Sequence, residues 1–217
     1  MLRALLLLSG CALCAAASPK RGYVADDCRG EKCNGNVLTN AAWFYAYNPA
    51  SPYSLNPPDG SFVPMHWCES GQDAPLPAGT NATFLLGYNE PNLKGQCGLA
   101  PADAAKAWAV YLKRWGGGAT QFVSPATAGN GIPWLDGFIG NCSALYGAAG
   151  CQLSYIAVHD YSCNATNLLT YLKSVSDVRL QASAMRRPSF CARFFLTPPT
   201  PNAALRYEGL AHGVFVW

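Results

Sequence analysis

The chain has 217 residues, of which 12% are charged and 12% aromatic, with 21 glycines and 16 prolines. This composition is typical of a globular, loop-rich domain and excludes a disordered chain. The formal net charge is only +3, and the basic residues are scattered along the sequence. A nucleic-acid partner is therefore not expected.

The first 17 residues have the pattern of an export signal. Arg3 supplies a positive start, and residues 4–17 form an apolar run that is too short to span a bilayer. The small residues 15–17 precede Ser18 as at a cleavage site. We expect a secreted, extracellular or cell-wall protein that has no membrane segment after signal removal. The alternative is a bacterial lipoprotein signal at residues 8–11, which would leave a lipidated Cys11.

The cysteine content supports the secretory interpretation. Ten cysteines fall to eight when Cys11 and Cys14 leave with the signal, and an even number in an exported chain predicts disulfides without fixing their pairing. Metal binding is the alternative, but no Cys-x-x-Cys pair remains and the three histidines are far apart. We expect neither a metal nor a cofactor. Three Asn-x-Ser/Thr tripeptides, at Asn81, Asn141 and Asn164, are candidate N-glycosylation acceptors.

Short apolar strands alternate with helices along most of the chain. Strands are predicted at residues 41–47, 61–67, 83–88, 121–124 and 154–159, and helices at 101–115, 134–145 and 168–175. Pro101 suits a first helical turn, and Gly116 to Gly118 end that helix. From Val178 onward the order breaks down around a proline-rich segment, with further strand candidates at 194–196 and 213–217.

Strands that alternate with helices favour parallel β/α units, and uninterrupted apolar strands fit a barrel or a sheet covered on both faces. The fold class is therefore α/β. We divide the chain into a signal peptide (1–17), a barrel portion (18–177) and an atypical C-terminal segment (178–217).

In a β/α barrel, functional groups lie at the carboxyl ends of the strands. Glu90 is the leading candidate, because a strand-end glutamate before Pro91 has a constrained backbone and could point into a cleft. With a raised pKa, its carboxyl group could donate a proton to a leaving oxygen. The alternative is that Glu90 only caps the next helix or pairs with a lysine. Other strand-end candidates are Trp67, Asn89, Ser124 and the triplet His159-Asp160-Tyr161.

Six motifs that occur in one order make the sequence similar to a known family. They are Trp43-x-Tyr45-x-Tyr47-Asn48, Phe62-Val63-Pro64-Met65-x-Trp67, Leu85-Leu86-Gly87-Tyr88-Asn89-Glu90-Pro91, Val123-Ser124-Pro125-Ala126, Trp134-Leu135-Asp136-x-Phe138 and Ile156-Ala157-Val158-His159-x-Tyr161. Over roughly residues 20 to 176 the chain resembles glycoside hydrolase family 128, the alkali-sensitive-linkage type of catalytic core. The resemblance implies a (β/α)8 barrel of the TIM type, in the large retaining clan A, that acts on β-1,3-glucan. Since about six strands are recognisable, we expect the barrel to be incomplete at its C-terminus.

The resemblance also implies roles for single residues. Glu90 matches the general acid/base, and Asn89 matches the residue that contacts the sugar 2-hydroxyl. The implied substrate-binding residues are Asn89, Trp67, Trp43, Tyr47, His159 and Tyr161, with the aromatic ones stacking on glucose rings. Trp43 and Tyr45 could equally belong to the core.

The second carboxylate of a retaining site is not recognisable. Such a site needs two carboxylates about 5–5.5 Å apart, one of which is the nucleophile. The resemblance implies that the nucleophile is a glutamate at the end of the seventh strand, usually within a Thr-Glu-Phe-like motif. No such motif follows Val178, and the only glutamate there, Glu208, follows no convincing strand. Asp160 and Glu69 are further candidates. Otherwise the C-terminal sequence comes from a missed splice or frameshift, or the chain is an inactive relative that still binds glucan.

Two functional hypotheses follow from these residues. The first is a secreted glycoside hydrolase that acts on β-1,3-glucan with Glu90 as its acid/base. The alternative is a catalytically inactive carbohydrate-binding relative, or a truncated fragment that lacks the nucleophile. The proline-rich tail is the only hint of a third hypothesis, a structural cell-wall protein. In the first two hypotheses the partner is a polysaccharide.

Overall fold

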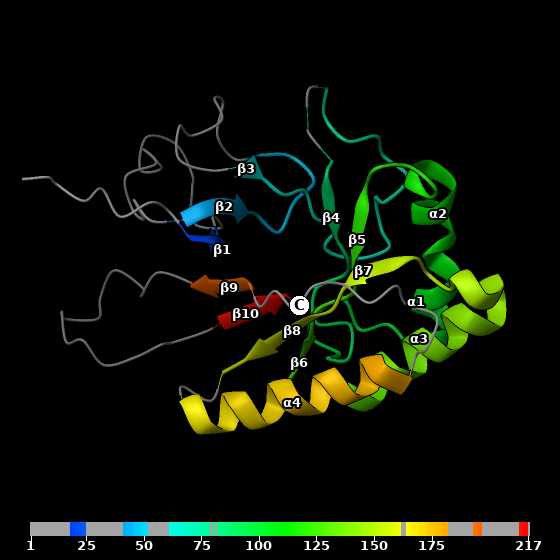
Figure 1. Ribbon diagram of the computed structural model, residues 1–217. Helices are drawn as coiled ribbons and strands as arrows, with labels where there is room; N and C mark the ends of the chain where they lie inside the picture. Colours follow the sequence, from blue (N-terminus) through cyan, green and yellow to red (C-terminus); the bar gives the residue numbers. More distant parts are fainter. Residues whose placement is uncertain are drawn as a thin grey trace, which may run out of the picture.

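The computed structural model describes residues 18–24, 41–51, 61–78, 80, 82–161, 164–181, 193–196 and 213–216. The strands are β1 (Ser18–Val24), β2 (Ala41–Tyr45), β3 (Ser61–Phe62), β4 (Phe84–Leu86), β5 (Gln121–Val123), β6 (Thr127–Ala128), β7 (Leu153–Tyr155), β8 (Ala157–Asp160), β9 (Arg193–Leu196) and β10 (Gly213–Val216). The helices are α1 (Pro101–Ala107), α2 (Ala109–Trp115), α3 (Ile132–Tyr146) and α4 (Ala165–Gln181), with a 3₁₀ turn at Gly147–Ala149. Figure 1 shows these elements together.

Strand pairing forms a closed ring. One sheet has the order β3-β2-β1-β9-β10-β8-β6 and the other has the order β4-β5-β7. Parallel bridges from Met65 to Leu86 and from Asn89 to Ala126 join the two sheets. β5 and β6 follow one another along a single strand path across the barrel, and so do β7 and β8. Each of these two pairs therefore fills one position, and the ten described strands make a ring of eight positions. The predicted alternation of parallel strands and helices is confirmed, whereas the expected opening at the C-terminus is not.

The seventh position of the ring differs from a parallel barrel. β9 pairs parallel to β1, but β10 lies between β8 and β9 and is antiparallel to both. In the register, Gly213 faces Asp160 and Val216 faces Ala157. The two strand candidates from the C-terminal segment thus complete the ring as one antiparallel pair.

Alternation along the strands separates two apolar clusters. Neighbouring residues of a strand point to opposite faces of the sheet. Leu86, Val123 and Ala157 therefore belong to a cluster inside the barrel, whereas their sequence neighbours belong to a cluster under the helices. The outer neighbours are Leu85, Phe122, Ile156 and Val158.

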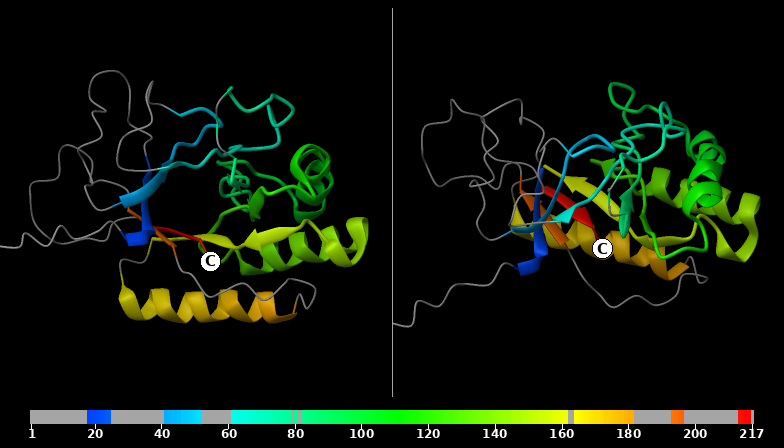
Figure 2. Two further views of the ribbon diagram at one scale, coloured as in Figure 1. Left: turned by 45° about the horizontal axis from the view of Figure 1, so that its top comes forward. Right: turned by 90° about the horizontal axis from the view of Figure 1, so that it is seen from above.

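The described helices cover the outside of the half-barrel formed by β4 to β8 (Figures 1 and 2). The predicted helix at 101–115 is present as α1 and α2, which are separated by a turn at Trp108. The Trp108 ring is fully buried and stacks on Tyr111 at 4.0 Å between ring centroids. α4 extends to Gln181, past the domain boundary that we placed after residue 177. Among the described residues, no helix is both long and apolar enough to cross a bilayer.

Candidate active site

Glu90 lies just beyond the end of β4, where the sequence placed it. Its backbone N–H donates to the Ala126 carbonyl at 2.8 Å, which ties it to the adjacent strand path. Its φ of +43° is unusual for a residue other than glycine and costs roughly 1–3 kcal/mol. Only 5% of the residue is exposed. The fold thus holds this carboxylate in a strained and nearly buried conformation, which indicates a functional constraint.

Two side chains from the end of β8 hold the Glu90 carboxylate. His159 Nδ1 donates to Glu90 Oε1 at 2.6 Å, and the Tyr161 hydroxyl donates to the same oxygen. His159 is 2% exposed and Tyr161 is 47% exposed, so one contact is buried and the other lies at the surface. No hydrogen bond to Oε2 is present among the described residues. Oε2 is therefore the carboxylate oxygen that these two contacts leave unused.

These contacts set the charge of the site. Burial alone would raise the pKa of Glu90, but the hydrogen bonds from His159 and Tyr161 and the His159 charge together bring that pKa below its usual value. Burial and the Glu90 carboxylate raise the pKa of Tyr161 well above its usual range, so the phenol remains a donor. In the ligand-free chain Glu90 is therefore a carboxylate at neutral pH.

Strand alternation explains why Asp160 does not join Glu90. In β8, Ala157 lies in the inner cluster and the next-but-one residue, His159, points to the same side. Asp160 points to the other side, where burial and then the Asp160 charge raise the pKa of Tyr171 on α4. The structure thus places Asp160 on the helix side of the sheet and not beside Glu90.

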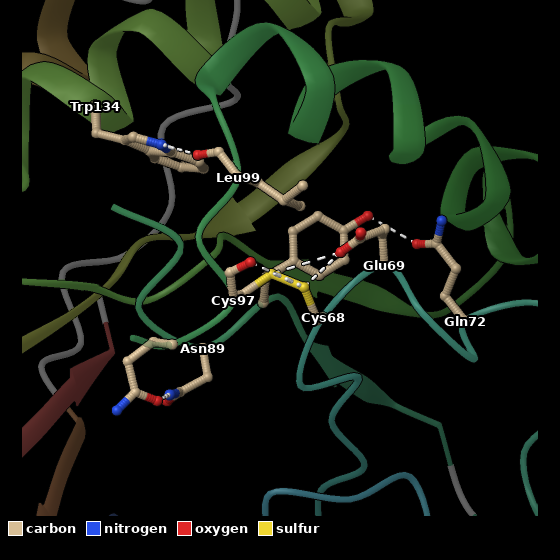
Figure 3. Close-up of a disulfide and its surroundings, with 9 residues drawn as sticks. Cys68, Glu69, Gln72, Asn89, Cys97, Leu99 and Trp134 are labelled. Atoms are coloured by element: carbon tan, nitrogen blue, oxygen red, sulfur yellow. Dashed lines mark hydrogen bonds between the residues drawn. A yellow bond between two sulfur atoms is a disulfide. The ribbon is translucent and has the colours of Figure 1, made fainter. Parts of the chain in front are cut away.

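Glu69, a further candidate for the second carboxylate, lies at a disulfide. Its carboxylate contacts the sulfur of Cys68, which is bonded to Cys97 (Figure 3). Burial, and then the charge of Glu69, raise the pKa of the Tyr88 hydroxyl. The two sulfurs and Glu69 lie within 4.8 Å of one another, but sulfurs in a disulfide are not thiolate ligands for a metal.

The described part of the seventh position carries no acid. The sequence of β10 is Gly-Val-Phe-Val, and β9 beside it is Arg-Phe-Phe-Leu. Glu208 lies outside the described residues, and its role stays a prediction. Within the described ranges, the hydrogen-bond partners of Glu90 are one histidine and one tyrosine, and no second carboxylate shares them.

Asn89 is held from both ends. Its backbone N–H donates to the Trp67 carbonyl at 2.8 Å, and its carbonyl accepts from Cys97 N–H at 3.4 Å. Its side-chain Nδ2 donates to Gln96 Oε1 at 3.0 Å. Asn89 Oδ1 is buried and has no hydrogen-bond partner among the described residues. An unpartnered buried acceptor costs about 1–3 kcal/mol, so this oxygen is a candidate contact for a ligand.

The predicted aromatic platforms differ in exposure. Trp67 is 37% exposed at the end of the third strand path, and Tyr161 is more exposed still. Tyr47 is half-buried and close enough to Tyr161 to influence its pKa. Trp43 is 5% exposed. Its ring packs so closely against Gly22 that a Cβ added to Gly22 would lie only 2.5 Å from the ring. Trp67, Tyr47 and Tyr161 therefore lie at three strand ends, and Tyr161 contacts Glu90, whereas Trp43 belongs to the inner cluster.

Two other side chains have clear roles in the structure. The hydroxyl of Ser124, a strand-end candidate, accepts a hydrogen bond from Ala157 N–H at 2.9 Å and donates one to the Pro125 carbonyl at 3.0 Å. The first bond ties the segment between β5 and β6 to β8. Its hydroxyl is thus used by the backbone. Gln96 was not foreseen, because nothing in the sequence distinguishes one polar side chain in an exposed loop from its neighbours.

Comparison with known proteins identifies the family of this chain. Residues 22–180 match the glycosyl hydrolase catalytic core family. The chain belongs to this family. Among curated relatives of this catalytic core, alkali-sensitive linkage protein 1 of Schizosaccharomyces pombe is 32% identical over 106 residues. That match covers 46% of this chain and 18% of the relative, so the chain spans less than a fifth of that protein's length.

Several solved structures of glucanases are similar to this chain. A GH128 subgroup I endo-β-1,3-glucanase from Amycolatopsis mediterranei, in complex with laminaritriose, is 26% identical with a TM-score of 0.62, covering 74% of this chain and 67% of its own. A subgroup II endo-β-1,3-glucanase from Pseudomonas viridiflava is 25% identical with a TM-score of 0.61, over 74% and 68%. An exo-β-1,3-glucanase from Cryptococcus neoformans, at 22% identity and a TM-score of 0.60 over 73% and 64%, shows the fold alone.

Proposed function

We propose that the chain binds β-1,3-glucan and hydrolyses it, with Glu90 as the general acid/base. The supporting observation is a single nearly buried carboxylate at a strand end, held by His159 and Tyr161. Exposed aromatic rings at neighbouring strand ends suit the apolar faces of glucose units. The similar glucanases make β-1,3-glucan the substrate class to test first.

In this proposal Glu90 works from its free Oε2. A protonated Glu90 donates to the leaving glycosidic oxygen, and the carboxylate then removes a proton from water. Because the hydrogen bonds to Oε1 lower the pKa of Glu90, the acid form is favoured only at low pH or once a ligand or second carboxylate changes the site. Retention requires that second carboxylate.

Hydrolysis of laminarin-type oligosaccharides tests the proposal. Purified protein should release reducing sugar, and Glu90→Gln should lower the rate by at least about 100-fold, since positioned acid/base groups contribute factors of that size. Asp136→Asn is the matched control, because Asp136 is an exposed carboxylate on α3, a helix that covers the outside of the barrel. Equal rates for wild type and Glu90→Gln would rule out the proposed role.

The second candidate function is glucan binding without hydrolysis. It is favoured by the reversed strand β10, whose described residues place no acid at the seventh position. Retention on insoluble β-1,3-glucan without sugar release would support it. Azide separates the two candidates on an aryl β-laminaribioside. If the nucleophile is missing, azide attacks C1, the phenolate leaves, and glycosyl azide forms. If the protein hydrolyses the aryl laminaribioside at a rate that azide does not change, and no glycosyl azide forms, a nucleophile is present.

We also propose that the protein is exported and loses residues 1–17. Two disulfides among the described residues, Cys68–Cys97 and Cys142–Cys151, support an oxidising compartment. Expression in a secretory host followed by intact-mass analysis should give a mature chain that begins at Ser18. A lipid-modified chain that begins at Cys11 would support the lipoprotein alternative instead.

A further inference from the structure

The loop after β4 determines how the Asn89 amide is oriented. Gln96 is exposed, and its Oε1 accepts a hydrogen bond from Asn89 Nδ2 at 3.0 Å. The Gln96 backbone N–H donates to the Leu93 carbonyl at 3.0 Å, which closes a turn of the same loop. The next residue, Cys97, is crosslinked to Cys68 (Figure 3). The crosslink and the turn therefore hold Gln96 where its side chain reaches Asn89.

An amide side chain has a donor end and an acceptor end, so its partner decides which end faces elsewhere. While Gln96 offers an oxygen, Asn89 must turn Nδ2 toward it. The other end, Oδ1, then faces away and is the buried acceptor without a partner among the described residues. Asn89 directly precedes Glu90, whose Oε2 accepts no hydrogen bond among the described residues. An acceptor and an acid thus come from two adjacent residues after β4.

We infer that Gln96 is a positioning residue that fixes the polarity of the Asn89 amide, so that Oδ1 accepts a hydrogen bond from a hydroxyl of the bound glucan. The inference rests on the proposed function for the identity of the ligand. The orientation of Asn89 itself does not depend on the ligand. Gln96 has no contact with the reacting atoms in this role, and it acts only through Asn89.

Three substitutions at this exposed position separate polarity from simple loss of a side chain. Gln96→Glu keeps an acceptor and should preserve the orientation of Asn89. Gln96→Leu removes the hydrogen bond, and Gln96→Lys offers only donors and should reverse the amide. The charge introduced by glutamate or lysine is controlled by repeating each measurement at 1 M salt, where exposed charges are screened within about 3 Å.

The first measurement needs no ligand. In wild type and Gln96→Glu, NMR should show slowly exchanging side-chain amide protons for Asn89, whereas Gln96→Leu should show fast exchange. The Asn89→Ala spectrum assigns the signals. Identical exchange in wild type and Gln96→Leu would overturn the inference, whatever the protein binds.

The second measurement is the affinity for laminaritriose. Gln96→Leu and Gln96→Lys should weaken binding about 3- to 10-fold, the range for one hydrogen bond, while Gln96→Glu retains affinity at high salt. In the Asn89→Ala background, Gln96→Leu should have no further effect, because the residue acts through Asn89. Additive losses would overturn the inference. If wild type binds no glucan, the proposed function fails, and the exchange experiment alone decides the positioning role.

Discussion

Replacement of Tyr161 by phenylalanine should raise the pKa of Glu90. The hydroxyl donates to Glu90 Oε1, and it is one of the contacts that hold this pKa below its usual value against the effect of burial. A hydrogen bond to a charged group contributes about 1.5–3 kcal/mol, and one pKa unit corresponds to about 1.4 kcal/mol. Because Tyr161 is 47% exposed, water can replace part of the bond, so we take the lower end. The expected shift is upward by about one unit.

The shift can be measured by ¹³C NMR of labelled glutamate carboxyl groups as the pH is lowered. Glutamates are few in this chain (Glu31, Glu69, Glu90 and Glu208), and the spectrum of Glu90→Gln identifies the resonance. If the protonated carboxyl is the working acid, the activity of Tyr161→Phe should persist to a pH about one unit higher. Tyr146→Phe is the control, because its hydroxyl donates to the Ala105 carbonyl far from the site. An unchanged or lowered Glu90 pKa would refute the role of Tyr161.

Three further predictions concern stability and modification. Gly87→Ala should destabilise the protein by about 1–3 kcal/mol in chemical denaturation, because its Cβ would lie 2.7 Å from the backbone nitrogen of Pro125. Gly95→Ala is the control and should be neutral, because its Cβ would meet nothing within 4 Å. Burial and then a nearby arginine charge lower the pKa of His66, so the folded chain binds this proton less readily than the unfolded chain. The melting temperature should therefore fall as the pH drops below about 6.5. In His66→Phe the melting temperature should fall less over the same pH range. In a eukaryotic secretory host, peptide mass spectrometry should find a glycan on Asn164, which is exposed and caps α4 through Oδ1 only. No glycan is expected on Asn141, whose Nδ2 donates a hydrogen bond within α3. The reverse pattern would show that these contacts of the folded chain do not decide which asparagine is glycosylated.

Much of the fold could be predicted from apolar patterns. The strand at 83–88 contains β4, and the helix at 134–145 lies within α3, because these segments bury continuous or helically spaced apolar residues. β1 was missed, since the residues Ser18 to Val24 are largely polar and form a strand through pairing with β2 and β9. Pairing between segments distant in the sequence leaves no local pattern to read.

The candidate site was predicted only in part. Glu90, His159 and Tyr161 could be named from their places after apolar strands, but the hydrogen bonds between them depend on the positive φ at Glu90 and on the register of two strand paths. Asp160 looked equivalent to its neighbours in the sequence, and only the alternation of β8 separates it from the site. Among the described residues, the predicted disulfides are present at two pairs, whose partners no spacing rule could assign.

The reversal of β10 makes the last two positions of the barrel a single module. In a parallel barrel each strand arrives with its own crossover, so positions are gained or lost one at a time. Here Leu196 ends β9 at the carboxyl rim and Gly213 begins β10 at the same rim, opposite Asp160. Removal of one strand would therefore remove the other, and leave β1 and β8 with unpaired edges. Replacement of this antiparallel pair as a unit would alter the rim beside Glu90 while leaving the six preceding strand positions intact.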